Sequence, residues 1–223
     1  MPRFAISDIH GCLTTFKALL EKIEFSQKDV LYLLGDYIDR GPNSKGVIDY
    51  IWNLQARGYQ IHCTLGNHEQ MLTNSIHKQI AHSHGLIETL SSFGVASTAE
   101  VPRKYITWIY DLPYYLEIED YLLVHAGLRF AGDPLADKEA MIWTRNWYED
   151  IDQDWLADRI IVHGHTPTPK SEIERNLKKL DTLPVINIDA GCVFNYQGYG
   201  HLCALNLDDL TFTFLKRIEA AWN

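Results

Sequence analysis

Three apolar runs in this 223-residue chain each end in a polar, glycine-containing turn. The runs cover residues 3–6, 30–34 and 59–65, and amphipathic stretches at 13–23 and 44–57 separate them. Apolar residues in those stretches recur at helical spacing, whereas 30–34 is continuously apolar, as in a strand buried on both faces. Each repeat is roughly 30 residues, the length of a βαβ crossover. This predicts an α/β fold with a parallel sheet whose three turns meet at its carboxyl edge, where ligands bind.

The rest of the chain continues with helices and then short strands. Residues 71–112 read as helical, with a break near Gly94 and a helix start at Pro102. Short apolar runs follow at residues 114–118, 121–124, 159–162, 185–188, 201–207 and 211–215. Few helices separate these runs, so we expect a second, more antiparallel sheet. No repeat or linker divides the chain, and we expect a single domain over residues 1–223.

Composition excludes several classes of function. The net charge of −9 argues against a protein whose main partners are bulk nucleic acid or an anionic membrane. No apolar stretch reaches the roughly 18 residues of a membrane helix, and the first residues lack the apolar core of a signal peptide. We therefore expect a cytoplasmic protein. The cysteines form no C-x-x-C pair; Cys12, Cys63 and Cys203 read as small core residues, whereas the pattern does not place Cys192.

The polar turns carry metal-ligand residue types. Each has an ordinary explanation: Asp8 or Asn67 could cap a helix, Asp36 could lie in a solvated loop, and His125 could be a buried core histidine. Yet five strand-end turns all present Asp, Asn or His beside glycine, which lets backbone approach a ligand closely. Carboxylate, amide and imidazole ligands without thiolate suit manganese, iron or zinc. Their number suits two metals that share a bridging carboxylate.

These motifs together resemble a known family. The residues that carry the resemblance are Asp8-Ile9-His10-Gly11, Gly35-Asp36-Tyr37-Ile38-Asp39-Arg40-Gly41, Gly66-Asn67-His68-Glu69, His125-Ala126-Gly127 and Gly164-His165-Thr166-Pro167. In this order they look like the phosphoprotein phosphatase family of calcineurin-like metallophosphoesterases, closest in form to compact bacterial and phage members. The resemblance implies a sandwich of two mixed β-sheets flanked by α-helices, with the metals at one edge.

The resemblance also implies a role for each matched residue. Asp8 and His10 would hold one metal and Asp36 would bridge, while Asn67, His125 and His165 would complete the second site, with manganese the most expected ion. His68 would be the general acid, oriented by Asp39, and Arg40 and Arg145 would bind the phosphoryl group. A hydroxide that bridges the metals would attack the phosphorus directly. Ser7 stands where many members have glycine. His163 is not a usual ligand, and it either forms a hydrogen bond near the site or is simply packed.

Three functions remain open. The leading interpretation is a phosphomonoesterase acting on phosphoserine and phosphothreonine in proteins, with dual specificity for phosphotyrosine open. The alternative is a symmetrical dinucleoside-polyphosphate hydrolase acting on diadenosine tetraphosphate; the short chain leaves little room for a nucleotide-binding cap, which favours the phosphoprotein. A catalytically inactive phosphate-binding scaffold is the third, although every matched role is filled. Residues 77–113 would shape the substrate site, with His77, His82 and His84 as exposed polar positions. Oligomeric state stays open.

Overall fold

The computed structural model describes residues 1–77 and 85–220 of the chain. His82, His84 and the side chain of His77 lie outside the described residues, so the structure does not test their expected exposure.

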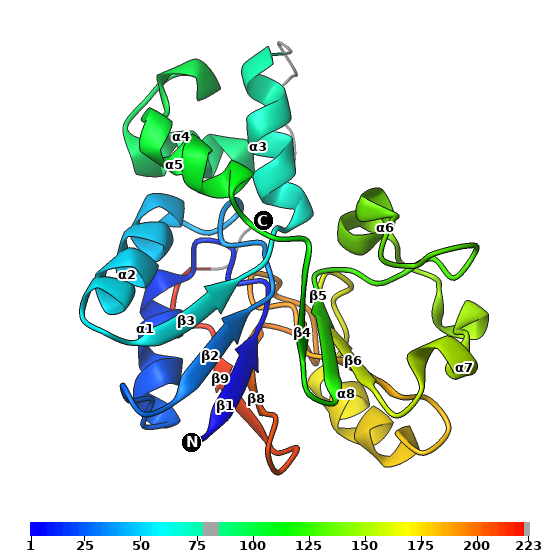
Figure 1. Ribbon diagram of the computed structural model, residues 1–223. Coiled ribbons are helices and arrows are strands. Elements are labelled where there is room, and N and C mark those ends of the chain that lie inside the picture. Colours follow the sequence, from blue (N-terminus) through cyan, green and yellow to red (C-terminus); the bar gives the residue numbers. More distant parts are fainter. Residues whose placement is uncertain (78–84, 221–223) are drawn as a thin grey trace.

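Nine strands in the described residues form two sheets (Figure 1). The first has the order β3-β2-β1-β8-β9, and its strands are β1 (Arg3–Ile6), β2 (Val30–Leu33), β3 (Gln60–Cys63), β8 (His201–Asn206) and β9 (Phe212–Lys216). The second has the order β4-β5-β6-β7, with β4 (Tyr115–Ile118), β5 (Tyr121–Val124), β6 (Ile160–His163) and β7 (Val185–Asn187). Both sheets are mixed, which confirms the predicted fold class.

Strand pairing confirms one prediction and corrects another. Strands β1, β2 and β3 are parallel, as the βαβ repeat predicts. The expectation that all six later strands form the second sheet is wrong, because β8 pairs antiparallel with β1, and β9 with β8. The order β3-β2-β1 would leave the buried strand β1 without a partner on one edge, and β8 satisfies those backbone groups.

The second sheet is also less antiparallel than expected. Only β4 runs antiparallel to its neighbour, whereas β5, β6 and β7 are parallel. The crossovers contain the short helices α6 (Lys138–Trp143), α7 (Gln153–Leu156) and α8 (Lys170–Asn176). Helices of one or two turns are too short to show a clear helical period in the sequence, which is why the prediction missed them.

The longer helices cover the first sheet and stand over its edge (Figure 1). Helices α1 (Leu13–Lys22) and α2 (Ser44–Ala56) flank the sheet, while α3 (Asn67–His77), α4 (Leu86–Phe93) and α5 (Arg103–Tyr110) gather above the strand ends. Single turns of 3₁₀ helix lie at Thr98–Glu100, Tyr148–Asp150 and Leu177–Lys179. The predicted break is present: Gly94 ends α4 with a φ of 67°, and Pro102 directly precedes α5.

Successive side chains along the strands alternate between the two faces of the sheet and so form two apolar layers. Leu31 and Leu33 are fully buried in the cluster that includes α1 and α2. Tyr32 points to the other face, where it joins Leu123 of β5 and Val162 of β6 in a second cluster between the sheets. Successive strand residues point to opposite faces, so a strand covered on both sides must be apolar throughout. This accounts for the continuous apolar run at 30–34.

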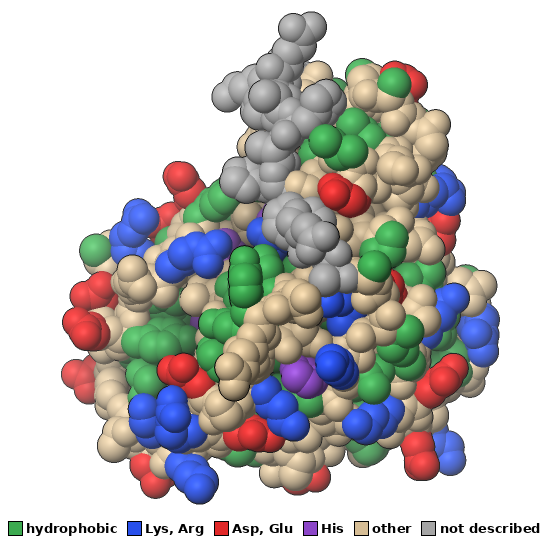
Figure 2. Space-filling model, turned by 180° about the vertical axis from the view of Figure 1, so that it is seen from behind, with side chains coloured by type: hydrophobic (Ala, Val, Ile, Leu, Met, Phe, Trp, Pro, Cys, Tyr) green, Lys and Arg blue, Asp and Glu red, His purple; other side chains and the backbone are tan. Residues whose placement is uncertain are grey.

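The remaining expectations concern cysteines and surface. All four cysteines are free and buried, as predicted for three of them, and Cys192 is buried as well. On the face shown in Figure 2, acidic and basic side chains are interspersed. Among the described helices, none has the length and apolar character needed to span a membrane.

Candidate active site

The polar turns meet where the carboxyl ends of the parallel strands of both sheets come together. His125, which follows β5 in the second sheet, donates from Nδ1 to the carbonyl of Leu34, beyond β2 in the first sheet, at 2.7 Å. The amide of His165, which follows β6, donates to Asp8 Oδ2 at 2.9 Å, although the two residues are 157 positions apart. The site is therefore a junction between the two sheets.

The backbone at this junction is unusually tight. A side chain at Gly164 would overlap the Ser7 hydroxyl and the Asp8 carboxylate, so only glycine fits between β6 and the turn after β1. Left-handed conformations are costly for residues other than glycine and persist where the surroundings hold them, often at functional sites. Six predicted site residues adopt them: Asp8, His10, Asp36, Asp39, Arg40 and His165.

Asp36 lies at the centre of the site. Its Oδ2 is 3.5 Å from His10 Nε2 and 3.9 Å from His68 Nε2. Its Oδ1 is 3.4 Å from His125 Nε2. Burial disfavours the ionised form of Asp36, but the surrounding histidines outweigh burial and hold the pKa of this carboxyl below its usual value. The two carboxylate oxygens thus face two separate groups of possible ligands.

Among the described residues, two groups of side chains are close enough to hold metal ions, and Asp36 belongs to both. One comprises His10, Asp36 and His68, and the other Asp36, His125 and His165. Asp8 is slightly farther away, with Oδ1 3.9 Å from His10 Nε2. The geometry therefore places His68, as well as Asp8, beside the first position, whereas the family resemblance assigns Asp8 to the metal and His68 to proton transfer.

The histidine tautomers show that this donor set fits cations. A carbonyl oxygen only accepts, so the bonds from Nδ1 of His10 to Ile38 (2.8 Å) and from Nδ1 of His125 to Leu34 (2.7 Å) place the proton on Nδ1. In the neutral ring Nε2 then carries the lone pair, and this atom lies 3.5 Å from an Asp36 oxygen in His10 and 3.4 Å in His125. Burial, and next the Arg40 cation, keep the pKa of His10 well below its usual value, so this imidazole stays neutral. A neutral imidazole oriented by a carbonyl is the usual form of a histidine metal ligand.

Asn67 adds a further oxygen on the His125 side. Its Oδ1 is 3.0 Å from His125 Nε2 and 2.9 Å from His165 Nδ1. In the neutral tautomer that donates from Nδ1 to Leu34, His125 Nε2 carries a lone pair, so two acceptors face each other here. A divalent cation would stabilise such an arrangement. Asn67 is also the first residue of α3. The same residue can therefore begin the helix and offer its side-chain oxygen to a metal.

His68 is held by Asp39. Nδ1 of His68 is 2.7 Å from Asp39 Oδ2, and Nε2 points toward Asp36. Burial lowers the pKa of His68, but the carboxylates of Asp36 and Asp39 outweigh it and raise the pKa above its usual value. A protonated, oriented imidazole directed into the site can donate a proton to a departing oxygen.

Both predicted arginines reach the site. Arg40 Nη1 is 2.6 Å from His10 Nε2, and its guanidinium lies over the ring of Phe194, 5.5 Å from the centroid. Arg145 Nη1 donates to the carbonyl of His165 at 3.2 Å. The structure therefore brings all ten predicted site residues to one junction.

Glu69 is a supporting residue whose role the sequence analysis missed. Its buried carboxylate accepts from the backbone amides of Asp36 (2.9 Å), Tyr37 (2.8 Å), Ile38 (3.3 Å) and Gly66 (3.1 Å). These bonds hold the turn after β2 in the shape that presents Asp36. The only signal in the sequence was a glutamate directly after Asn67-His68, which is equally common at the first turn of a helix.

Thr89 of α4 is the second missed residue. Its hydroxyl donates to Asp39 Oδ1 at 2.5 Å, and its oxygen accepts from the Asp39 amide at 2.9 Å. Ser44 also accepts from that amide, at 3.0 Å. Thr89 is fifty positions from Asp39 in the chain, and a lone threonine in an amphipathic helix carries no sequence signal for such a contact.

Two open points of the sequence analysis are resolved by contacts. Ser7, in place of glycine, donates its hydroxyl to Asp8 Oδ2 and so supports that carboxylate. His163 is buried, its Nδ1 donates to the carbonyl of Gly164 at 2.8 Å, and its Nε2 is 2.5 Å from the Tyr148 hydroxyl. Burial lowers the pKa of His163 to about 4, so it is neutral and accepts from Tyr148. His163 therefore makes its hydrogen bonds beside the candidate ligand His165, to Gly164 and Tyr148.

Comparison with known proteins identifies relatives of this chain. Residues 1–202 match the family model described as calcineurin-like phosphoesterase. The asymmetrical bis(5′-nucleosyl)-tetraphosphatase PrpE of Geobacillus thermodenitrificans is 30% identical, with 92% of this chain and 90% of the relative covered. A solved protein serine/threonine phosphatase from Saccharomyces cerevisiae is 15% identical, with a TM-score of 0.69, and 99% of this chain and 81% of that one are covered. The last likeness is one of fold.

Proposed function

Because the chain belongs to the calcineurin-like phosphoesterase family, we propose that it hydrolyses dinucleoside tetraphosphates asymmetrically, releasing a nucleoside monophosphate and a nucleoside triphosphate. The observation that carries the chemistry is the carboxylate of Asp36, which faces one ligand group with each oxygen. A shared carboxylate between two groups of histidines suits a pair of divalent cations.

The proposed ligands follow from position. Asp8, His10 and Asp36 would hold one cation, and Asp36, Asn67, His125 and His165 would hold the other, with manganese the expected ion and iron or zinc compatible with the ligand types. When bound, such cations would lower the pKa of a water molecule at the site and offset charge on phosphoryl oxygens. His10 Nε2 has a single lone pair, which accepts from Arg40 in this structure, so a metal held there would replace that hydrogen bond.

The chain's own residues carry the other parts of the reaction. Arg40 and Arg145 bind the phosphoryl oxygens and stabilise the charge that develops on them. His68 gives a proton to the departing oxygen, and Asp39 keeps its imidazole in the donating orientation. Water attacks the phosphorus in line with the bond that breaks.

Sequence relatives favour a dinucleoside polyphosphate over a phosphoprotein. The protein-phosphatase interpretation relied on the chain being too short for a nucleotide-binding cap. This chain aligns with 90% of the length of relatives named as tetraphosphatases, and 92% of this chain is included, so the relatives are of similar length. Chain length therefore does not argue against the nucleotide substrate. The relatives are named asymmetrical, which also replaces the symmetrical cleavage of our sequence-based alternative.

A product assay tests this proposal. Purified protein with manganese is offered diadenosine tetraphosphate and, in parallel, phosphoserine, phosphothreonine and phosphotyrosine peptides. We expect the dinucleotide to have the higher kcat/KM, and chromatography to show AMP and ATP in equal amounts. Two ADP molecules would contradict asymmetrical cleavage. Faster release of phosphate from the peptides would favour the phosphatase, and no turnover of any substrate would favour the inactive scaffold.

A further inference from the structure

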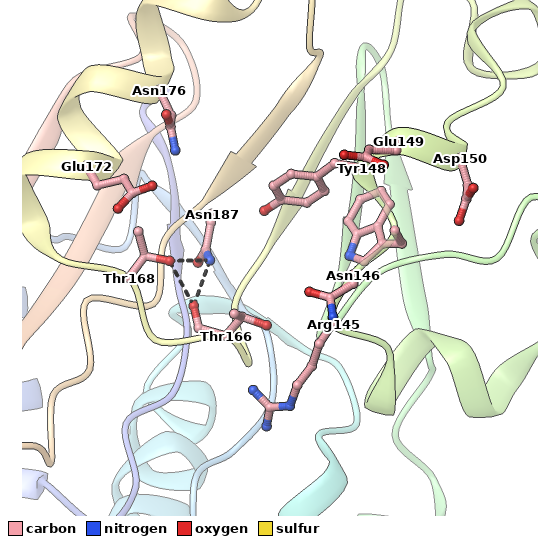
Figure 3. A pocket seen from close by; sticks show the side chains of 11 residues that line it. Arg145, Asn146, Tyr148, Glu149, Asp150, Thr166, Thr168, Glu172, Asn176 and Asn187 are labelled. Atoms are coloured by element: carbon pink, nitrogen blue, oxygen red, sulfur yellow. Dashed lines mark hydrogen bonds between the residues drawn. The ribbon is translucent and has the colours of Figure 1, made fainter.

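A pocket of about 490 Å³ opens beside the metal-ligand junction. This volume is within the range of small-molecule sites, about 300–1,000 Å³. Segment 145–150, the loop at 166–168 and helix α8 supply most of the walls (Figure 3). Arg145 lines the pocket and also donates to the carbonyl of His165, and Thr166 directly follows that histidine. A ligand in the pocket is therefore adjacent to a phosphoryl group bound by Arg145.

The charged side chains that line the pocket disfavour binding of any phosphate group beyond the one at Arg145. The carboxylates of Glu149, Asp150 and Glu172 line it, and Arg145 supplies the positive charge among the lining residues. Three carboxylates repel phosphate but accept hydrogen bonds from hydroxyl and amino groups. The hydroxyl oxygen of Thr166 is buried and has no hydrogen-bond partner within the described part of the chain. The pocket thus suits a neutral ligand rich in hydroxyl and amino groups, joined to one phosphate at the Arg145 end.

An aromatic ring is fixed in the wall of this pocket. The Tyr148 hydroxyl donates to the buried His163, and its ring contacts Trp147 edge-on with centroids 4.9 Å apart. Across the pocket, Glu172 and Asn176 of α8 face Tyr148, whereas the Arg145 side chain extends away at one end (Figure 3). A rigid aromatic ring opposite polar side chains is a typical surface for stacking a base and binding its ribose.

We infer that this pocket binds the nucleoside attached to the phosphorus that is attacked, which rests on the proposed function. A peptide substrate would extend on both sides of its phosphoryl group, whereas this pocket lies on one side of Arg145. With the nucleoside here, the bound phosphate is Pα. Water oxygen forms a new bond to Pα and gives up one proton to solvent, while the bond from Pα to the bridging oxygen breaks. That oxygen leaves on the nucleoside triphosphate with the electron pair and a proton from His68.

Isotope labelling tests which phosphorus is attacked. Hydrolysis of diadenosine tetraphosphate in ¹⁸O-water is followed by mass spectrometry of both products. Attack at Pα places the label on AMP, as the pocket requires. Attack at Pβ would place it on the terminal phosphate of ATP, and that result would overturn the inference while leaving asymmetrical hydrolysis intact.

Substitutions test the pocket itself. Tyr148→Leu removes the ring face, and Glu172→Gln removes a carboxylate; Glu174→Gln, a solvent-exposed change on the same helix, is the matched control. We expect the ratio of kcat/KM on diadenosine tetraphosphate to that on para-nitrophenyl phosphate to fall at least about fivefold in Tyr148→Leu and to fall in Glu172→Gln, but to be unchanged in Glu174→Gln. Equal ratios in all variants, or a selective loss on phosphopeptides with basic residues, would refute the nucleoside site.

Inhibition by AMP separates failure of this inference from failure of the proposed function. AMP should inhibit hydrolysis of para-nitrophenyl phosphate competitively, and its inhibition constant should rise in Tyr148→Leu. If the wild-type protein does not cleave diadenosine tetraphosphate but AMP inhibition shows this dependence, the substrate proposal fails and the pocket stands. If AMP inhibits all variants equally, or none, the pocket does not bind the nucleoside.

Discussion

Asp36 shows how opposing forces set the state of one residue at the junction. Burial alone would protonate this carboxyl, because a buried charge is costly without partners. The surrounding histidines, chiefly His125 and His68, favour the ionised form. A stable carboxylate with an oxygen toward each ligand group is what a bridging ligand requires.

Replacing Asp36 tests the bridge. Asp36→Asn keeps the shape but removes the charge and one strong ligand oxygen, so we expect metal retention to fall at both positions. Metal content after gel filtration, measured by plasma mass spectrometry, checks this. Asp49→Asn, a change on α2 away from the junction, is the control. Full metal content and full activity in Asp36→Asn would rule out the bridging role.

His68 can be tested separately as acid and as ligand, because the geometry allows either. His68→Asn should lower kcat on alkyl phosphates by about 10²–10⁴-fold, but should lower turnover of para-nitrophenyl phosphate less, since that leaving group barely needs a proton. Metal content should stay unchanged if His68 is the acid.

The control for that experiment is His62→Asn, an exposed histidine on β3 that stacks on Tyr32. It should leave both activities unchanged. Equal losses on the two substrates, together with a loss of metal, would show that His68 is a ligand and not the acid.

Helix α4 connects the residues above the sheet edge to the turn that follows β2. The carbonyl of Gly85 accepts from the Arg40 amide at 3.3 Å, and a side chain at Gly85 would overlap the Arg40 backbone. Thr89, one turn later, holds Asp39 through both its backbone and its carboxylate. The start of α4 thus fixes two adjacent residues in left-handed conformations.

Thr89→Val should therefore weaken the acid without touching the substrate. Losing a buried hydroxyl that both donates and accepts leaves Asp39 poorly oriented, and we expect kcat on alkyl phosphates to fall about fivefold to tenfold, with KM little changed. Thr89→Ser restores the hydroxyl and should recover the activity, whereas Ser91→Ala, exposed on the same helix, is the control. A loss that Thr89→Ser does not rescue would point to packing instead of positioning.

At the scale of the whole molecule, the site joins the two sheets. Asp8, His10, Asp36 and Asn67 come from the first sheet, and His125 and His165 come from the second. Cations bound by both sets would connect the sheets at their carboxyl edges and would bind only the folded state. Metal binding should therefore stabilise the whole fold.

Thermal unfolding measures that connection. At about a hundredfold excess over the dissociation constant, manganese should raise Tm by roughly 5–10 °C for a chain of this size. The shift should vanish with chelator and be much smaller in His165→Ala, which removes a ligand from the second sheet. An equal shift in that variant would mean that manganese binds elsewhere.

Much of the fold and site was predictable because the strand ends carry the chemistry. The continuous apolar run at 30–34 and the repeat around it indicated a parallel sheet, and parallel strands place their following turns at one edge. The contacts of Glu69, Thr89 and Tyr148 were not predictable. Each depends on a hydrogen bond whose partner is set by packing, and a single glutamate, threonine or tyrosine has no pattern to reveal it.

The sequence by itself determined the first three parallel strands, the types and order of the ligand residues, and the likeness to metallophosphoesterases. Only the tertiary structure decided that β8 and β9 complete the first sheet, because strand order depends on which buried edge needs a partner. It also decided which nitrogen of His10 and of His125 points into the site, since carbonyls of the neighbouring turn fix the tautomers. The pocket beside Arg145 likewise exists only where the loop at 166–168, α8 and segment 145–150 meet.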